Sequence, residues 1–123
     1  MHEHLLRGRR VLIAEDEYLL AYCLRDELEQ AGATVLGPAP SVDAALALIE
    51  SSPMTDGAVL DINLNGELVF AAADALAARG VPFVFTTGYE QGAVPERYSH
   101  VTRYEKPFDP ADIVRALLRE LPN

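Results

Sequence analysis

Acidic and basic side chains stand at the ends of apolar runs in this sequence. Glu15 and Asp16 follow the run VLIA, Asp61 ends the run AVLD, and Lys106 follows VTRYE. If these runs are parallel strands of one sheet, their carboxyl ends meet at one edge and bring the four side chains together. Three carboxylates at one place repel each other unless a cation neutralises them. We therefore expect a divalent cation at this edge.

The ligand types favour Mg²⁺. Carboxylate and carbonyl oxygens, with no histidine or cysteine nearby, suit a hard cation that keeps several of its waters. We expect Asp16 and Asp61 to bind Mg²⁺ directly and Glu15 to bind it directly or through water. The backbone carbonyl of Asn63 is expected to supply a further oxygen. Glu17 is expected in the first turn of a helix instead, where its charge meets the positive end of the helix dipole.

Five short apolar runs alternate with segments of helical spacing. Continuous apolar runs without strict alternation are typical of strands covered on both faces. The expected strands are Val11–Ala14, Ala33–Gly37, Ala58–Ile62, Pro82–Thr87 and Val101–Tyr104. The expected helices cover residues 20–31, 42–49, 68–77 and 113–121, with Ser41 as an N-cap. Gly92 and Pro95 predict a short or poorly formed helix after the fourth strand.

This order of elements determines the expected fold. Repeated βα units require a parallel sheet with right-handed crossovers. We therefore predict an α/β, flavodoxin-like (βα)5 doubly wound parallel sheet with strand order 2-1-3-4-5. Half of the 123 residues are hydrophobic, which fits one domain over 1–123 with a flexible N-terminal segment over 1–9.

Charge and composition exclude several classes of partner. The net charge of −9 would repel a phosphate backbone, so we expect no nucleic-acid partner. No apolar run approaches the roughly 20 residues that a membrane span requires. The single cysteine, Cys23, cannot form a disulfide within the chain and is expected to be a small core residue. These features predict a cytoplasmic protein.

Four motifs together resemble the receiver domains of bacterial two-component response regulators. They are VLIAEDE, AVLDINLNGE, FVFTTGY and EKPFDPADIVRAL, and the resemblance covers almost the whole chain. The run FTTGY is similar to a subgroup whose motif reads Phe-Ala-Thr-Gly-hydrophobic-Tyr. Thr86 and Glu90 depart from that pattern.

The resemblance implies a role for each matching residue. Asp61 would be the phosphoacceptor, taking a phosphoryl group from a sensor histidine kinase or a histidine phosphotransfer protein. Lys106 would neutralise the developing charge, and the Thr87 hydroxyl would bind a phosphoryl oxygen. The backbone N–H groups of Asn63 and Gly88 would bind further phosphoryl oxygens. Strand alternation allows only one threonine of the Thr86–Thr87 pair to reach the site, and the position beside Gly88 favours Thr87.

The resemblance also implies a cis peptide bond between Lys106 and Pro107. It implies that the protein signals to a downstream protein target by altered protein–protein interaction, and that it catalyses only its own phosphorylation and dephosphorylation. On that basis it is a phosphoprotein and not an enzyme. The sequence leaves open whether it forms a homodimer and whether the native gene continues past Asn123. A single-domain regulator is the expectation.

Two other functions stay open at this stage. An aspartyl-phosphate-forming phosphatase or phosphotransferase normally carries an Asp-x-Asp pair after its first strand, whereas here the acceptor candidate follows the third strand. A non-phosphorylated docking module with the receiver fold is the second alternative. The switching element is also open, because Arg103 occupies the place of the aromatic residue that many receivers carry three residues before the lysine. Either Tyr104 or a reordering of residues 90–100 would then report phosphorylation.

Overall fold

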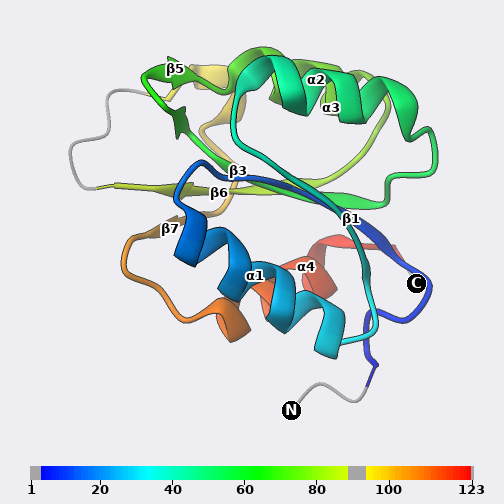
Figure 1. Ribbon diagram of the computed structural model, residues 1–123. Coiled ribbons are helices and arrows are strands. Elements are labelled where there is room, and N and C mark those ends of the chain that lie inside the picture. The colour runs from blue at the N-terminus through cyan, green and yellow to red at the C-terminus, as the bar shows by residue number, and fades with distance from the viewer. Residues whose placement is uncertain (1–3, 89–93, 123) are drawn as a thin grey trace.

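A five-stranded parallel sheet forms the centre of the molecule. The computed structural model describes residues 4–88 and 94–122 (Figure 1). The order of the strands is β2-β1-β3-β6-β7. Their bounds are Arg10–Ala14 for β1, Thr34–Ala39 for β2, Gly57–Asp61 for β3, Phe83–Thr87 for β6 and Arg103–Glu105 for β7. Because β4 and β5 form a separate small sheet, β6 and β7 are the fourth and fifth strands of this one. Its order is therefore 2-1-3-4-5, and the predicted topology is confirmed.

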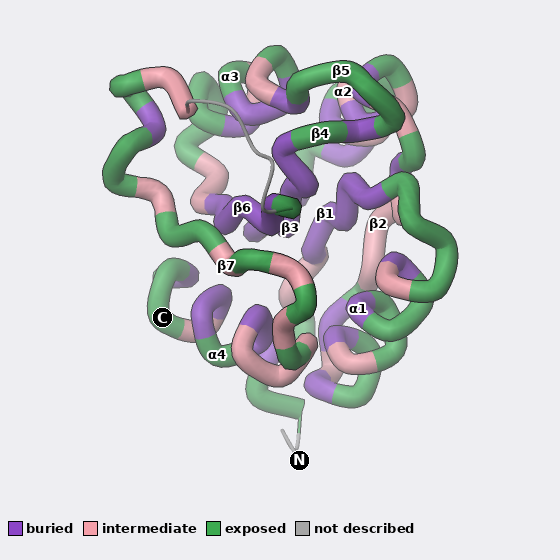
Figure 2. Tube along the Cα trace, turned by 90° about the vertical axis from the view of Figure 1, so that its left-hand side faces the viewer, coloured by how far each residue is buried: buried purple, intermediate pink, exposed green. Residues whose placement is uncertain are grey.

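Helices cover both faces of this sheet. In Figure 1, α2 (Val42–Ser51) and α3 (Phe70–Ala78) lie on one side of it, and α1 (Tyr18–Gln30) and α4 (Pro110–Glu120) on the other. Each side has its own hydrophobic cluster, one with α2 and α3 and one with α1 and α4. Every residue of β3 and β6 is buried as a result (Figure 2). The burial explains why these strands read as continuous apolar runs rather than alternating ones.

Helix α3 begins two residues later than the sequence predicts. Leu68 was expected on its apolar face, but it is more than half exposed and lies in β5 (Glu67–Leu68). That strand pairs antiparallel with β4 (Asn63–Leu64) in a small hairpin. Asn65 and Gly66, at the turn of this hairpin, both have positive φ angles. Leu68 therefore belongs to the hairpin, although its spacing from the following apolar residues would fit a helix.

The segment after β6 forms little regular helix in its described part. Only the 3₁₀-helix η1 (Glu96–Tyr98) appears there, after Pro95, which is its N-cap. The prediction of a short or poor helix is confirmed for residues 94–100, whereas residues 89–93 lie outside the described chain. Ser41 is confirmed as the N-cap of α2, since its Oγ accepts a hydrogen bond from the Ala44 amide at 3.1 Å.

Two residues lie in places that the sequence does not indicate. Leu6 is fully buried in the cluster with α1 and α4, and its amide donates to the carbonyl of Ala31 at 2.7 Å. This part of the 1–9 segment therefore packs on the domain, which differs from the flexible segment expected there. Cys23 is exposed on α1, so its assignment as a core residue is wrong. The buried stripe of α1 consists of Ala21, Leu24 and Leu28. None of the described helices is both long and apolar enough to cross a membrane.

Candidate functional site

Strand register brings the predicted residues to one edge of the sheet. Ala14 of β1 pairs with Leu60 of β3, so Glu15 follows at the level of Asp61. Asp61 in turn pairs with Thr86 of β6, and Thr86 with Tyr104 of β7. Parallel strands that end together place their following side chains side by side. The convergence expected from the sequence is thus present.

Lys106 reaches across this edge to two carboxylates. Its Nζ lies 2.7 Å from Oδ2 of Asp61 and 3.2 Å from Oε2 of Glu15. Its backbone amide donates to the Thr87 carbonyl at 2.8 Å, which fixes the start of the side chain beside β6. The Lys106–Pro107 peptide bond is cis, as the resemblance implied. The lysine therefore faces the site and is not a solvated loop residue.

The pKa of Glu15 is shifted strongly by its place in the site. Glu15 is 2% exposed, and burial, followed by the negative charge of Asp61, raises its pKa from the ordinary 4.5 to about 7. The hydrogen bond from the Glu17 amide and the positive charge of Lys106 lower the pKa of Glu15 and offset part of this rise. For Lys106, burial lowers the pKa, but the hydrogen bond to Asp61 and the charges of both carboxylates outweigh it and raise the pKa. The site therefore holds a charged lysine and an acid that titrates near neutrality.

The acidic residues can hold a cation. Glu15, Asp16 and Asp61 each offer a carboxylate oxygen, and these oxygens all lie within 4.8 Å of one another. Within the described chain, Oε1 of Glu15 is buried without a hydrogen-bond partner, which leaves one oxygen available for a ligand. Asp16 is exposed, so the cluster opens to solvent and a cation can enter. Three carboxylate ligands, two of them buried and one exposed, fit one small hard cation.

The β4–β5 hairpin forms one wall of the site. The Asn63 amide donates to Oδ1 of Asp61 at 3.2 Å, and the Asn65 amide donates to Oδ2 of Asp16 at 3.1 Å. The hairpin thus orients two of the three carboxylates through backbone amides. That the Asn63 carbonyl is a metal ligand stays a prediction. Glu17 is the N-cap of α1 and lies just before its first turn, with a side-chain oxygen 3.8 Å from Lys106 Nζ.

The two threonines at the end of β6 lie on different faces of the sheet. Phe83 and Phe85 pack in the cluster with α2 and α3, and Val84 in the cluster with α1 and α4. Because side chains alternate along a strand, Thr87 lies on the α2 and α3 side of the sheet and Thr86 on the α1 and α4 side. Thr86 is also the residue that pairs with Asp61 in the neighbouring strand. The Thr87 hydroxyl donates to the Gly88 carbonyl at 3.0 Å. Its contact with a phosphoryl group stays a prediction.

Gly88 and Thr86 add two details that bear on this edge. Among the described residues other than its chain neighbours, nothing lies within 4 Å of the place that a Cβ atom on Gly88 would occupy. The Thr86 hydroxyl is completely buried and has no hydrogen-bond partner among the residues that the structure describes. Sequence reasoning set Thr86 aside in favour of Thr87, because Thr87 stands next to Gly88. The register of Thr86 with Asp61, readable from two aligned strands, was the signal that could have found it.

Comparisons with known proteins found similar solved structures and a similar curated protein. No protein-family model matches the chain. The solution structure of SdrG from Sphingomonas melonis Fr1 is 41% identical, with a TM-score of 0.77, over 89% of this chain and 96% of that one. A response regulator receiver protein from Sinorhizobium medicae WSM419 is 25% identical, with a TM-score of 0.73, over 93% and 97% of the two chains.

One curated relative is longer than this chain. The transcriptional regulatory protein PdtaR of Mycobacterium tuberculosis is 30% identical over 113 residues. The match takes in 89% of this chain but only 55% of PdtaR. The chain therefore spans about half the length of the curated relative that it matches.

Proposed function

Because this chain belongs to the receiver domains of response regulators, we propose that it accepts a phosphoryl group on Asp61 and signals by altered protein–protein interaction. The proposed donor is the phosphohistidine of a sensor histidine kinase or of a histidine phosphotransfer protein. The proposed location is the bacterial cytoplasm, with a downstream protein as the target. The observation that carries the proposal is the placement of Lys106 Nζ 2.7 Å from the Asp61 carboxylate, beside an acidic cluster that fits Mg²⁺.

In the proposed reaction, an Asp61 carboxylate oxygen attacks phosphorus. The new O–P bond forms as the P–N bond to histidine breaks, and the electron pair of that bond stays on the imidazole nitrogen. The step brings one anion against another, so it requires positive charge that is already in place. Lys106 supplies an ammonium that hydrogen bonds hold at this position before the donor arrives.

Mg²⁺ would be held by Glu15, Asp16 and Asp61, with the Asn63 carbonyl as a further ligand. When bound, it supplies charge neutralisation to the carboxylates and to the phosphoryl oxygens. Glu15 must give up a proton near neutral pH to act as a ligand, which its pKa of about 7 allows.

The donors for the phosphoryl oxygens come from the end of β6 and from the β4–β5 hairpin. We propose the Thr87 hydroxyl and the backbone amides of Gly88 and Asn63 for this role. In the unphosphorylated protein the Asn63 amide donates to Asp61 itself and the Thr87 hydroxyl to a carbonyl. Both donors must therefore exchange partners after phosphorylation. This exchange would distinguish the phosphorylated protein from the free one.

The chemistry is performed on the protein itself, so we do not propose an enzyme acting on a separate substrate. Membership in the Phe-Ala-Thr-Gly-hydrophobic-Tyr subgroup is part of the proposal, supported by Phe85, Thr87 and Gly88 at the end of β6.

Incubation with acetyl phosphate and Mg²⁺, followed by intact mass measurement, tests the proposal. Wild type and an Asp43→Asn control, changed on the exposed first turn of α2, should each gain one phosphoryl mass. Asp61→Asn should gain none. Equal labelling of Asp61→Asn would refute the acceptor assignment, and no labelling of wild type would favour a docking module that is not phosphorylated. Catalytic turnover of a small phosphoester would favour a phosphatase instead.

A further inference from the structure

We propose that Asp74, Arg97 and Tyr98 form a latch that fastens residues 94–102 to helix α3, and that phosphorylation at the Asp61 edge releases it. This inference rests on the proposed function, because it names the element that the phosphoryl group would switch. The latch lies outside the site described above and contributes no residue to it.

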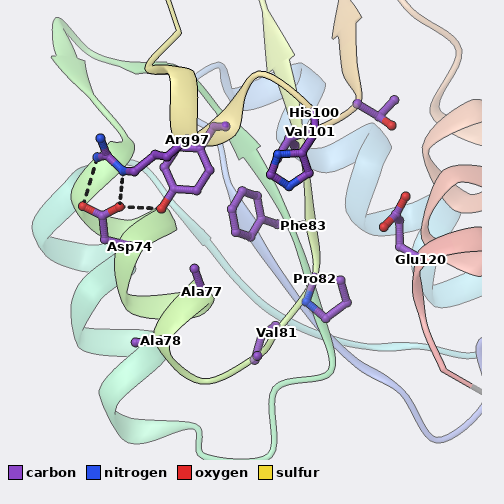
Figure 3. A pocket seen from close by; sticks show the side chains of 13 residues that line it. Asp74, Ala77, Ala78, Val81, Pro82, Phe83, Arg97, His100, Val101 and Glu120 are labelled. Atoms are coloured by element: carbon purple, nitrogen blue, oxygen red, sulfur yellow. Dashed lines mark hydrogen bonds and ion pairs between the residues drawn. The ribbon is translucent and has the colours of Figure 1, made fainter.

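The latch consists of three contacts on one aspartate of α3. Nε and Nη2 of Arg97 donate to the two carboxylate oxygens of Asp74, at 3.0 and 3.2 Å (Figure 3). The hydroxyl of Tyr98 donates to the same carboxylate. The Arg97 guanidinium also lies over the Tyr98 ring, 4.9 Å from its centre. Two neighbouring residues of η1 are thus tied to α3 by one side chain.

An aromatic cluster connects the latch to strand β6. Tyr98 is 5% exposed, and its ring centre lies 5.5 Å from that of Phe83 and 5.9 Å from that of Phe85. Phe70, from the start of α3, stacks on Tyr98 and meets Phe85 edge to face. Close-packed rings of this kind exchange between discrete arrangements rather than deform gradually. A shift in β6 would therefore be transmitted to Tyr98.

Strand β6 ends at the phosphoryl-binding edge. Thr87 lies two residues after Phe85 and, by alternation, on the same face of the sheet as the aromatic cluster. Its carbonyl accepts from the Lys106 amide, so the end of β6 and Lys106 are coupled. If the Thr87 hydroxyl turns to a phosphoryl oxygen, it must leave the Gly88 carbonyl that it now contacts. This movement would take place on the face of β6 that also carries Phe85.

The other aromatic candidate for a switch is placed differently. Tyr104 packs in the cluster with α1 and α4, and its hydroxyl accepts from Nη2 of Arg119 on α4 at 3.2 Å. Arg103 is exposed. Among the tyrosines that the structure describes, Tyr98 is therefore the one that contacts the Phe83 and Phe85 rings on the Thr87 side of the sheet.

The latch is suited to release because it is half open to water. The side chains of Asp74 and Arg97 are 50% and 54% exposed, so solvent screens their attraction. A phosphoryl group needs only a modest difference in affinity between the latched and released states to shift their populations. A cavity of about 750 Å³ adjoins the latch and is lined by Phe83, Arg97 and Tyr98 (Figure 3). Release would reshape this cavity and so change the surface offered to a partner.

Amide hydrogen exchange tests the release. The amides of Tyr98, Ser99 and Val101 are hydrogen-bonded within the segment, to the carbonyls of Pro95, Glu96 and Tyr98. Their exchange should become at least tenfold faster in protein that intact mass shows to be phosphorylated. Amides in the middle of α1 should be unaffected. Phosphorylated protein with unchanged exchange at these three amides would overturn the latch and leave the proposed function standing.

Variants test the coupling in the reverse direction. Tyr98→Phe removes one hydroxyl, Asp74→Asn weakens all three contacts, and neither residue belongs to the acceptor site. Coupling between two sites is reciprocal, so both unlatched variants should bind beryllofluoride, a phosphoryl mimic, about three- to tenfold more tightly in the presence of Mg²⁺. Fluorine NMR titration measures this affinity. Glu29→Gln is the matched control, because it breaks an ion pair with Arg25 on α1 that is similarly exposed.

The outcomes separate the two proposals. Unchanged beryllofluoride affinity in Tyr98→Phe and Asp74→Asn, together with normal phosphorylation, would overturn the latch alone. If wild type neither gained phosphoryl mass nor bound beryllofluoride, the proposed function would be wrong. Release of the latch by phosphorylation would then be wrong as well. Equal tightening in Glu29→Gln would show a general effect of lost surface charge and would likewise overturn the latch.

Discussion

Lys106 Nζ hydrogen-bonds Oδ2 of Asp61 at 2.7 Å, although 45 residues separate the two in the chain. The same ammonium lies 3.2 Å from Glu15, so one cation joins two buried carboxylates. This arrangement offsets part of the negative charge at the edge of the sheet before any metal or phosphoryl group arrives. Phosphorylation of Asp61 would therefore change the charge that Lys106 contacts.

Replacing Lys106 by methionine should slow phosphorylation of Asp61 on the order of 100-fold, because a carboxylate must then attack an anionic donor without the ammonium. The time course of intact mass with acetyl phosphate and Mg²⁺ measures this rate. Arg25→Met, which removes an exposed cation from α1, should phosphorylate at the wild-type rate. A Lys106→Met rate within twofold of wild type would contradict the role given to the lysine.

The stability of the metal-free protein should fall as the pH rises from about 4.5 towards 8. The folded pKa of Glu15 is raised to about 7, so its contribution is fully present below the ordinary value of 4.5 and is lost as the pH passes through 7. The difference amounts to at most about 3 kcal/mol in the free energy of unfolding. Urea unfolding in the presence of a chelator measures it. Glu15→Gln should flatten this dependence, whereas Glu50→Gln, on the exposed side of α2, should retain it.

Mg²⁺ should stabilise the protein much more at pH 8 than at pH 5. At the higher pH the three carboxylates are charged and repel one another, whereas at pH 5 Glu15 is largely protonated and a poor ligand. A free Mg²⁺ concentration 100 times the Kd should add about 2.7 kcal/mol. Thermal unfolding at both pH values gives this comparison, with Asp16→Asn expected to lose most of the effect. Equal stabilisation at the two pH values would count against Glu15 as a ligand.

Thr86→Val should stabilise the protein by about 1 kcal/mol. The Thr86 hydroxyl is buried without a partner in residues 4–88 and 94–122, so a methyl group of the same shape removes a desolvation cost. Thr55→Val offers the opposite case, because the buried Thr55 hydroxyl donates to the Ser52 carbonyl at 2.7 Å. It should lose about 1 kcal/mol. Chemical denaturation of both variants compares them directly, and a destabilised Thr86→Val would reveal a partner for the hydroxyl.

Leu6→Ala should destabilise the domain by about 2–4 kcal/mol, because it leaves a cavity beside α1. The neighbouring Leu5 is 58% exposed, and Leu5→Ala should change stability by less than about 0.5 kcal/mol. The pair tests whether the segment before β1 is part of the folded domain. Similar stabilities of the two variants in urea would show that this segment contributes nothing to the core.

Much of the framework could be predicted from the sequence. The apolar runs around Val11, Ala58 and Phe83 are continuous because two layers of helices bury them, and this pattern is local enough to read directly. Parallel order then follows from the βα alternation, and with it the meeting of Glu15, Asp61 and Lys106 at one edge. The acidic cluster was predictable for the same reason, because it needs only the strand ends and their order.

Other properties could only be decided by the tertiary structure. Leu68 has helical spacing but lies in a hairpin, Cys23 borders an apolar stripe but faces water, and Leu6 precedes the first strand but is buried. In each case the side chain's surroundings come from residues distant in the chain, and no local pattern encodes them. The hydrogen bond from Tyr98 to Asp74 is of this kind. For Lys106 and Asp61 the sequence predicted a common edge, and the structure added the direct hydrogen bond between them. The sequence determined which elements form and in which order, because hydrophobic periodicity is a local property. Only the packed structure decided which side chains make direct contact, because distances between side chains depend on the register and rotation of whole elements.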